Sequence, residues 1–359
     1  MKVLYLSNQP RFLGGAERSL YELLKNLDRS RVQPFFASIY EEEVCQAIQR
    51  LGIPFLKLKP FSRKNFFPLI ENTISLIRFI RQNRIEIIHN NQCVDAYYSL
   101  LAGKCTHTPV IIHHRDSKYY RLDRLVIRLA EYQISTSTWQ NRLFFQNQAI
   151  LIHNGIEMNS FPPMIESHPI LDETVKIGII GRIAPLKNQD VFILAARYVI
   201  NRKNNVRFKI IGDIDTSPYQ EYKKYLRSLV QEQGVSNWVE FCGYIPNVVE
   251  ALSQIDILVS ASQRESFGRV LVEAMACGKP VIGTNVWGAV DIVTPECGLL
   301  VPPNDPQSLG EAILTLANNP EMRERMGKAG RARVEQNFTI QHTLEKIYAL
   351  YEQILNHSH

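Results

Sequence analysis

The chain has 359 residues, of which 45% are hydrophobic and 21% charged, and its net charge is +6. This length exceeds what one ordinary core accommodates, so we expect two domains. The composition is ordinary for a soluble globular protein and excludes disordered or fibrous classes.

Localisation is predicted from what the sequence lacks. No apolar run reaches the length of a membrane span, and no signal peptide precedes the first expected strand. The six cysteines are scattered without a C-x-x-C pair, which favours reduced thiols over a disulfide frame or a zinc site. We therefore expect a cytoplasmic protein.

The first half alternates short apolar runs with longer amphipathic ones. The expected strands cover residues 3–7, 35–39, 53–58, 85–89, 109–113 and 150–153. The expected helices cover residues 15–27, 44–51, 68–82, 96–104 and 122–132. This alternation is typical of a parallel sheet covered by helices.

Asn154-Gly155 and a proline-rich stretch, residues 160–173, then predict an interdomain linker. Beyond it the expected strands cover residues 176–181, 206–212, 239–242, 255–260, 280–283 and 299–301. The expected helices cover residues 190–201, 219–233, 248–253, a segment opening near Gly268, 306–317, 320–337 and 339–355. We place the two domains at residues 1–166 and 167–338, with a cleft between them.

The helix opening near Gly268 is apolar on nearly every side except at Glu273. Such a helix should be buried, and a buried carboxylate is costly unless something binds it. A structural partner would satisfy Glu273, and so would a ligand. A second acid, Glu265, lies in the preceding loop and favours the ligand.

Free backbone N–H groups at the start of this helix, on Ser266, Phe267 and Gly268, fall between the two acids. A helix N-terminus with free amides binds anions. A carboxylate at each end with an anion site between them suits a ligand with hydroxyls at both ends and phosphate in the middle. A sugar nucleotide has this layout.

Two other loops follow first strands. Gly14-Gly15 lets backbone approach a phosphate or sugar, although tight turns use such pairs widely. Arg182 and Lys187, in the loop after residues 176–181, could converge on a diphosphate, and the alternative is two solvated loop cations.

A fourth group, His113-His114-Arg115-Asp116, follows the fifth strand, and His89 ends the fourth. One histidine alone is more often structural. Three histidines and an arginine at adjacent strand ends favour a polar catalytic rim.

Several nucleotide and hydrolase motifs are missing: G-x-G-x-x-G, the P-loop and G-x-S-x-G. These absences weigh against a dinucleotide enzyme or a P-loop ATPase. Asp213 and Asp215 have the spacing of a metal-binding pair, but a turn explains them, and we expect no metal site.

Together these segments resemble the retaining, nucleotide-sugar-dependent glycosyltransferases of family 4. The resemblance covers nearly the whole chain and is strongest over residues 260–303. It rests on Glu265-x7-Glu273, the loop from Gly181-Arg182 to Lys187, Asn154-Gly155-Ile156, Gly14-Gly15-Ala16-Glu17 and the run from Gly298 to Pro303. It implies an α/β GT-B fold of two Rossmann-like domains, with residues 339–359 packing back onto the first.

The resemblance also implies roles. Glu273 would anchor the ribose hydroxyls, and Glu265 would hold a hydroxyl of the donor sugar. Arg182 and Lys187 would neutralise the departing diphosphate without a metal or cofactor, and the sugar would be transferred with retention at the anomeric carbon. The implied donor-binding residues are Gly15, Gly181, Arg182, Lys187, Glu265, Ser266, Phe267, Gly268, Val270 and Glu273.

The chain departs from the family at one point. Members often carry a His just before the Asp that ends the fifth-strand motif, and this chain has Arg115 there. Either Arg115 supplies charge to the sugar phosphate or a neighbouring His takes over. The candidate catalytic residues are Glu265, Arg182, Lys187, His114 and Arg115.

The acceptor would be a glycan, a lipid-linked molecule or a small molecule bound by the first domain. Residues 1–166 carry 21 Lys and Arg against 14 Asp and Glu, and the stretch from Lys57 to Arg84 has seven bases against one acid. Beside Phe61, Phe66 and Phe67, these bases suggest peripheral docking on the inner, anionic face of a membrane. A solvated basic helix face is the alternative, and no nucleic-acid module accompanies the charge.

Three competing functions remain open. A nucleotide-sugar epimerase would form the epimer without an acceptor. A phosphorylase of similar architecture would carry pyridoxal phosphate. A non-catalytic sugar-nucleotide-binding protein would bind the nucleotide without turnover.

Overall fold

The computed structural model consists of two α/β units. The first unit comprises Met1–Gly155 and Ile340–His359, and the second comprises Ile156–Thr339. The residues that the structure describes are 1–12, 14–60, 67–93, 96–115, 127, 129–146, 148–164, 174–213 and 219–357.

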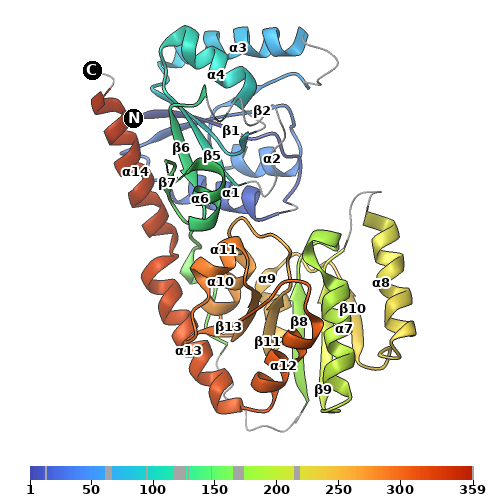
Figure 1. The fold of residues 1–359 in the computed structure, drawn as a ribbon. Coiled ribbons are helices and arrows are strands. Elements are labelled where there is room, and N and C mark those ends of the chain that lie inside the picture. The colour runs from blue at the N-terminus through green and yellow to red at the C-terminus, as the bar shows by residue number, and fades with distance from the viewer. Residues whose placement is uncertain are drawn as a thin grey trace. The chain divides into compact units, whose positions relative to one another are not determined.

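The first unit is built on a seven-stranded sheet in the order β3-β2-β1-β4-β5-β6-β7 (Figure 1). All of its strand pairs are parallel. The strands are β1 (Lys2–Leu6), β2 (Gln33–Ser38), β3 (Phe55–Lys57), β4 (Ile87–Asn90), β5 (Val110–His114), β6 (Tyr132–Ser135) and β7 (Ile150–Leu151).

Helices cover both faces of this sheet, because alternate strand residues point to opposite sides. Val3 and Tyr5 of β1 join one core cluster, and Leu4 and Leu6 join another. The first cluster includes residues of α1 (Gly15–Asn26), α2 (Glu43–Gln49) and α14 (Ile340–His357). The second includes residues of α3 (Phe67–Asn83) and α4 (Ala96–Thr106), while α6 (Thr138–Phe145) contributes to a smaller third cluster.

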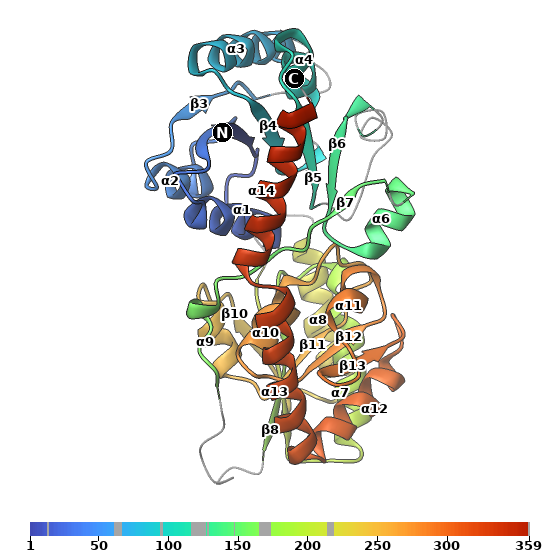
Figure 2. The ribbon, with the colours of Figure 1, turned by 90° about the vertical axis from the view of Figure 1, so that its left-hand side faces the viewer.

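The last helix, α14, belongs to the first unit although the second unit precedes it in sequence (Figure 2). A buried polar chain links it to the sheet. The Tyr351 hydroxyl lies 3.0 Å from that of Tyr5 and 2.6 Å from His89 Nδ1, and His89 Nε2 lies 3.1 Å from His113 Nδ1. These contacts satisfy polar groups that the core would otherwise leave unpaired.

The second unit has a six-stranded parallel sheet in the order β10-β9-β8-β11-β12-β13. Its strands are β8 (Val175–Ile180), β9 (Val206–Ile211), β10 (Val239–Gly243), β11 (Ile257–Ser260), β12 (Val281–Thr284) and β13 (Gly298–Val301). Because all strands are parallel, their carboxyl ends lie along one edge, where ligands of open α/β sheets bind.

Two core clusters lie on opposite faces of this sheet. Ile257 and Val259 of β11 pack into one, and Leu258 packs into the other. The first cluster draws on α7 (Gln189–Ile200), α8 (Gln220–Glu232), α12 (Pro306–Ala317) and Met322 and Met326 of α13 (Pro320–Asn337). The second draws on α9 (Val248–Ser253), α10 (Arg269–Ala276), α11 (Trp287–Ile292) and Val334 of α13. The predicted fold class, two parallel-sheet α/β domains, is confirmed.

The predicted elements differ from the structure mainly in one region. The helix expected over 122–132 is wrong at its end, because Tyr132 begins β6 and pairs with Ile111 of β5. Residues 116–126 lie outside the described residues. The sequence also missed α6 and α11, which are short and lack a clear amphipathic repeat.

The junction between the units differs from the expected boundary at residue 166. It falls between Gly155 and Ile156, and again between Thr339 and Ile340. Phe161, inside the predicted linker, is buried in the second unit, and the Met164 N–H donates to the carbonyl of Cys277. These contacts explain why the start of the proline-rich stretch belongs to the second unit. Residues 165–173 lie outside the described residues.

Close packing of α13 on α10 makes Gly327 sensitive to substitution. A Cβ at this position would lie 2.0 Å from the carbonyl oxygen of Gly278. We expect Gly327→Ala to cost about 1–3 kcal/mol of stability, since α13 must shift to admit the methyl group. Thermal unfolding measures the loss, with the exposed neighbour Lys328→Ala as the control. Equal midpoints for the two variants would contradict this packing.

The buried histidines predict acid sensitivity. Burial, aided by the charge of Arg115, lowers the pKa of His89 from its ordinary value of 6.5 to about 3. Between these values the unfolded chain binds a proton that the folded chain does not. Stability is therefore complete above pH 6.5 and falls as the pH drops, by about 1.4 kcal/mol per pH unit for one such histidine.

Unfolding midpoints of the wild type and of His89→Asn, measured between pH 7.5 and 5, check this expectation. The variant should lose less stability on acidification than the wild type. His342→Asn, on the exposed side of α14, is the control and should behave like the wild type. An unchanged pH dependence in His89→Asn would show that His89 does not resist protonation.

Candidate functional site

Two loops at the carboxyl edge of the second unit's sheet are tied together. One follows β8 and the other follows β11. The Gln263 backbone N–H donates to the Leu186 carbonyl at 3.0 Å, and the Gln263 side-chain amide donates to Asn188 Oδ1 at 2.8 Å. Asn188 in turn donates to Asn304 Oδ1 at 2.8 Å. The predicted site residues of the two loops are thus held in one place, by residues that the sequence did not single out.

Lys187 and Glu265 meet at this edge. Lys187 Nζ lies 2.5 Å from Glu265 Oε2, although the residues are 78 positions apart. The Ser262 hydroxyl donates to the same carboxylate oxygen at 3.3 Å. The side chains are 29% and 16% exposed, so the pair is shielded but open to solvent. The ammonium of Lys187, which the sequence predicted to face a diphosphate, therefore also neutralises Glu265.

Glu273 lies on α10, and its side chain is 7% exposed. The predicted burial of this helix is confirmed: Leu271, Val272 and Ala274 are fully buried. Glu273 has a charged partner, since Arg269 Nε donates to its Oε1 at 2.7 Å. Sequence reasoning left a structural partner open but did not name Arg269. The spacing of four residues on one helix was the available signal.

Gly268 caps α10 with a φ of 102°, in the left-handed region that favours glycine. The Gly288 N–H donates to the Glu265 carbonyl at 2.9 Å, and a Cβ on Gly288 would lie 2.2 Å from the Phe267 carbonyl oxygen. The Phe267 side chain packs into the core, and Val270 lies against the same cluster. Glycine at these positions therefore lets the Glu265–Gly268 loop pack directly on α11.

Glycines also mark the ends of three neighbouring strands. Gly181, Gly212 and Gly243, at the ends of β8, β9 and β10, have φ values of 148°, 146° and 74°. A Cβ on Gly212 would lie 1.9 Å from the Gly181 carbonyl oxygen. Only Gly181 was predicted as a site residue. At these three strand ends the backbone takes conformations that favour glycine, and no side chain extends from it.

Arg182 is exposed, and its guanidinium lies 5.5 Å from the centre of the Tyr219 ring. Its carbonyl accepts a hydrogen bond from Gln189 Nε2 at 3.0 Å. The predicted convergence of Arg182 with Lys187 on a diphosphate stays a prediction.

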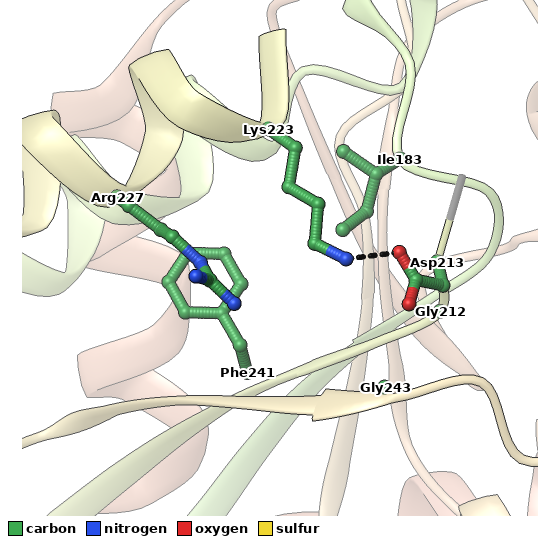
Figure 3. A pocket seen from close by; sticks show the side chains of 7 residues that line it. All are labelled: Ile183, Gly212, Asp213, Lys223, Arg227, Phe241 and Gly243. Atoms are coloured by element: carbon green, nitrogen blue, oxygen red, sulfur yellow. Dashed lines mark hydrogen bonds and ion pairs between the residues drawn. The ribbon is translucent and has the colours of Figure 1, made fainter. Parts of the chain in front are cut away.

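A small cavity of about 110 Å³ lies at the same edge (Figure 3). Lys223 of α8 pairs across it with Asp213, and Arg227 extends toward the ring of Phe241. Its lining residues are Ile183, Gly212, Asp213, Lys223, Arg227, Phe241 and Gly243. Asp213, which the sequence assigned to a turn, forms an ion pair, and Asp215 lies outside the described residues. No group of three or more His, Cys, Asp or Glu in the described part of the chain is placed to hold a metal.

The first unit holds the other predicted residues. Gly15 begins α1 and is exposed. His114 is fully buried, with its ring 4.3 Å from that of Phe145 and its Nε2 3.2 Å from Gln133 Oε1. Burial lowers the pKa of His114 to about 3, so the ring is neutral at physiological pH.

Arg115 is also buried, 6% exposed, and its guanidinium pairs with Asn154 Oδ1 and lies 3.4 Å from His113 Nδ1. Burial and the neighbouring guanidinium lower the pKa of His113 well below its ordinary value. The sequence predicted a polar catalytic rim at these strand ends. In the structure the side chains of His113, His114 and Arg115 are buried, and their catalytic role stays a prediction. Asp116 is outside the described residues.

Two family models match the chain. The model of glycosyltransferase family 4 matches residues 13–159, and that of glycosyl transferases group 1 matches residues 160–333. Among curated proteins, the chain is 31% identical over 211 residues to the capsular polysaccharide biosynthesis glycosyltransferase CapM of Staphylococcus aureus.

Coverage differs among these relatives. The match to CapM covers 57% of this chain and 54% of CapM. That to a D-inositol 3-phosphate glycosyltransferase of Jonesia denitrificans covers 55% of this chain and 50% of that protein, at 31% identity. The chain thus spans about half the length of these two relatives. An uncharacterised glycosyltransferase of Methanocaldococcus jannaschii is 27% identical, with 99% of both chains covered.

Solved structures share the fold. Anabaena HepE in complex with UDP and glucose superposes with a TM-score of 0.83 at 22% identity, over 98% of this chain and 99% of that one. A sucrose-phosphate synthase from Thermosynechococcus elongatus gives a TM-score of 0.84 at 20% identity, over 99% of both chains. With two adjoining family models spanning residues 13–333 and these neighbours sharing both parallel-sheet domains, the chain belongs to the family 4 glycosyltransferases and has the GT-B fold.

Proposed function

We propose that the protein is a retaining, metal-independent glycosyltransferase that moves a sugar from a nucleoside diphosphate sugar to a hydroxyl acceptor. The observation that supports this most strongly is the pairing of Lys187 with Glu265 at the carboxyl edge of the second unit's sheet. Glu273 follows on the adjoining helix. Two acids, a cation and the N-terminus of α10 then belong to one continuous region.

In this proposal the donor lies along that region. Glu273 accepts hydrogen bonds from the ribose hydroxyls, and Glu265 accepts one from a hydroxyl of the sugar. Lys187 and Arg182 face the diphosphate, with the amides of Ser266, Phe267 and Gly268. A diphosphate would compete with Glu265 for Lys187, so one ammonium would link the phosphate end of the donor to the sugar end.

The chemistry follows from where charge develops. The bond between the anomeric carbon and the diphosphate oxygen breaks, and the electron pair leaves with the nucleoside diphosphate. The acceptor hydroxyl oxygen forms the new bond to that carbon, and its proton passes to the released diphosphate. Fixed cations and backbone N–H groups stabilise that growing negative charge without a metal. Gly15, a further predicted donor residue, belongs to the first unit, and that unit would bind the acceptor.

Related proteins indicate which substrates should be tested first. HepE was solved with UDP and with UDP-glucose, which makes a UDP-sugar the first donor to try. CapM acts in capsular polysaccharide biosynthesis, so a glycan or lipid-linked acceptor of polysaccharide synthesis is the first acceptor class to test.

A membrane surface is proposed as a second partner of the first unit. Among the described residues, no helix combines the length and apolarity that crossing a membrane requires. On α3, however, the exposed fractions of Phe67, Ile70 and Ile74 are 77%, 57% and 43%. Their spacing of three and four residues puts them on one face, and the exposed Arg78 and Arg81 continue that face. Apolar residues beside cations suit the interface of an anionic bilayer. Phe61, Arg63, Lys64 and Phe66 lie outside the described residues.

The proposed donor roles predict different kinetics for two variants. Lys187→Ala should lower kcat by about 100-fold with a smaller change in KM, since leaving-group charge grows in the transition state. Glu273→Gln should raise the KM for the donor by about tenfold, because its contacts form in the ground state as well. Initial rates with the nucleotide sugar chosen from a thermal-shift panel of UDP, GDP, ADP and CDP measure both effects.

Lys224→Ala, an exposed lysine paired with Glu221, is the matched control and should retain wild-type rates. Full activity of either site variant would refute its assigned role, and complete loss of wild-type activity with EDTA would reveal a metal requirement. Epimer formation without acceptor would identify an epimerase. Nucleotide binding with no turnover across an acceptor panel would favour a non-catalytic protein.

The α3 surface predicts salt-sensitive membrane binding. Co-sedimentation with vesicles of phosphatidylglycerol and phosphatidylcholine should decrease at high salt, because Arg78 and Arg81 are screened. The double variant Ile70→Ser/Ile74→Ser should bind several-fold less at any salt concentration, since less apolar surface is buried. Arg50→Glu, an exposed base on the C-cap of α2, is the control. Failure of the wild type to sediment with anionic vesicles would leave α3 as a solvated basic helix.

A further inference from the structure

The buried ion pair between Arg269 and Glu273 supports an inference about how the nucleoside end of the site works. We propose that Arg269 is a positioning residue, which holds Glu273 as a fixed acceptor for the vicinal hydroxyls of the ribose. The inference rests on the proposed function, since it names the residue that prepares Glu273 for its ligand.

Arg269 lies at an unfavourable position for a cation on its helix. Arg269 is the first residue of α10, where the positive end of the helix dipole disfavours a cation. A basic residue preceding an acidic one by four positions is also the weaker orientation for a helical ion pair. The stability of α10 therefore does not account for an arginine here.

Burying both charged side chains also costs free energy. The side chains of Arg269 and Glu273 are 8% and 7% exposed, and the helix positions between them, Leu271 and Val272, are fully buried and apolar. Replacing such a buried ion pair by apolar residues of similar size is often neutral or stabilising. The burial of Arg269 and Glu273 is thus weak evidence that the pair stabilises the fold. A role in the donor site explains the pair better.

The chemistry of the two groups gives that role. A guanidinium only donates hydrogen bonds, and an ionised carboxylate only accepts them. By donating from Nε to Oε1 at 2.7 Å, Arg269 orients the carboxylate of Glu273. Hydroxyl donors from a cis-diol then meet an acceptor whose direction is already set.

The balance of charge in the site also supports this role of Arg269. A nucleoside diphosphate would otherwise approach two carboxylates, Glu265 and Glu273, and be repelled by both. Each has its own cation instead, Lys187 at 2.5 Å and Arg269 at 2.7 Å. The buried pair is neutral as a whole, so Glu273 can offer acceptor oxygens without repelling the neighbouring phosphates.

The experiment compares ribose with deoxyribose. Isothermal titration of UDP and GDP, each beside its 2′-deoxy form, gives the preference for the hydroxyl in the wild type, Arg269→Met, Arg269→Lys and Glu273→Gln. The wild type should prefer the ribonucleotide by about tenfold or more, which is the worth of one charge-assisted hydrogen bond. Arg269→Met should reduce this preference to less than about threefold, and Arg269→Lys should recover part of it.

The double variant Arg269→Met/Glu273→Gln tests whether the two residues act together. It should discriminate no worse than Glu273→Gln alone, because residues that act through one contact are not additive. Additive losses would place Arg269 outside the Glu273 contact and overturn the inference. Circular dichroism and thermal unfolding verify each fold, and Arg269→Gln decides the question if Arg269→Met does not fold.

The binding measurements distinguish a failure of the Arg269 inference from a failure of the proposed function. A wild-type ribose preference that persists in Arg269→Met or Arg269→Gln overturns the inference and leaves the proposed function standing. A wild type that binds nucleoside diphosphates without discriminating against the deoxy forms removes Glu273 and Arg269 from the ribose site. A wild type that binds no nucleoside diphosphate removes the proposed function, and the inference with it.

Discussion

The organising constraint of the second unit is the burial of negative charge at one edge of its sheet. Glu273 lies on a helix packed among apolar side chains, and Glu265 lies half-buried in the loop before it. Neither carboxylate could be kept there unpaired, since an isolated buried charge costs far more than one hydrogen bond returns. Arg269 and Lys187 meet the two acids separately. Because one cation comes from the same helix and the other from a loop 78 residues away, the site forms only when the sheet has assembled.

Backbone packing makes the same edge approachable. The ends of β8, β9 and β10 are glycines with positive φ, and the Gly181 and Gly212 backbones touch where a side chain would not fit. Gly268 and Gly288 similarly let the loop carrying Glu265 lie against α11. The charged groups thus lie beside strand and loop ends that carry no side chain at these glycines. In the proposed metal-independent transfer, the N-terminus of α10 and the cations would together stabilise the leaving group.

The first unit presents a different arrangement. Its polar residues at the ends of β4 and β5 are turned inward, where they join α14 to the sheet through Tyr351, His89 and His113. Arg115, at the point where the chain departs from its family's pattern, pairs with Asn154 just before the junction of the two units. The histidines are neutral because they are buried, which suits a structural network and makes the unit sensitive to acid. On α3, by contrast, exposed apolar and basic side chains lie on one face.

The sequence by itself determined the two-domain α/β design, most strand and helix positions and the burial of α10, because local periodicity records which face of each element is covered. It also identified Lys187, Glu265 and Glu273 as residues of interest. Only the tertiary structure decided that Lys187 meets Glu265 and that His113, His114 and Arg115 are enclosed. The pairing of Arg269 with Glu273, four residues apart on one helix, had a signal in the sequence that was not used. The tertiary structure also supplied β6 and α6, whose short segments have too little periodicity to be recognised. Contacts between distant segments and the burial of polar side chains depend on how the strands are ordered in space, and no local pattern in the chain encodes that order.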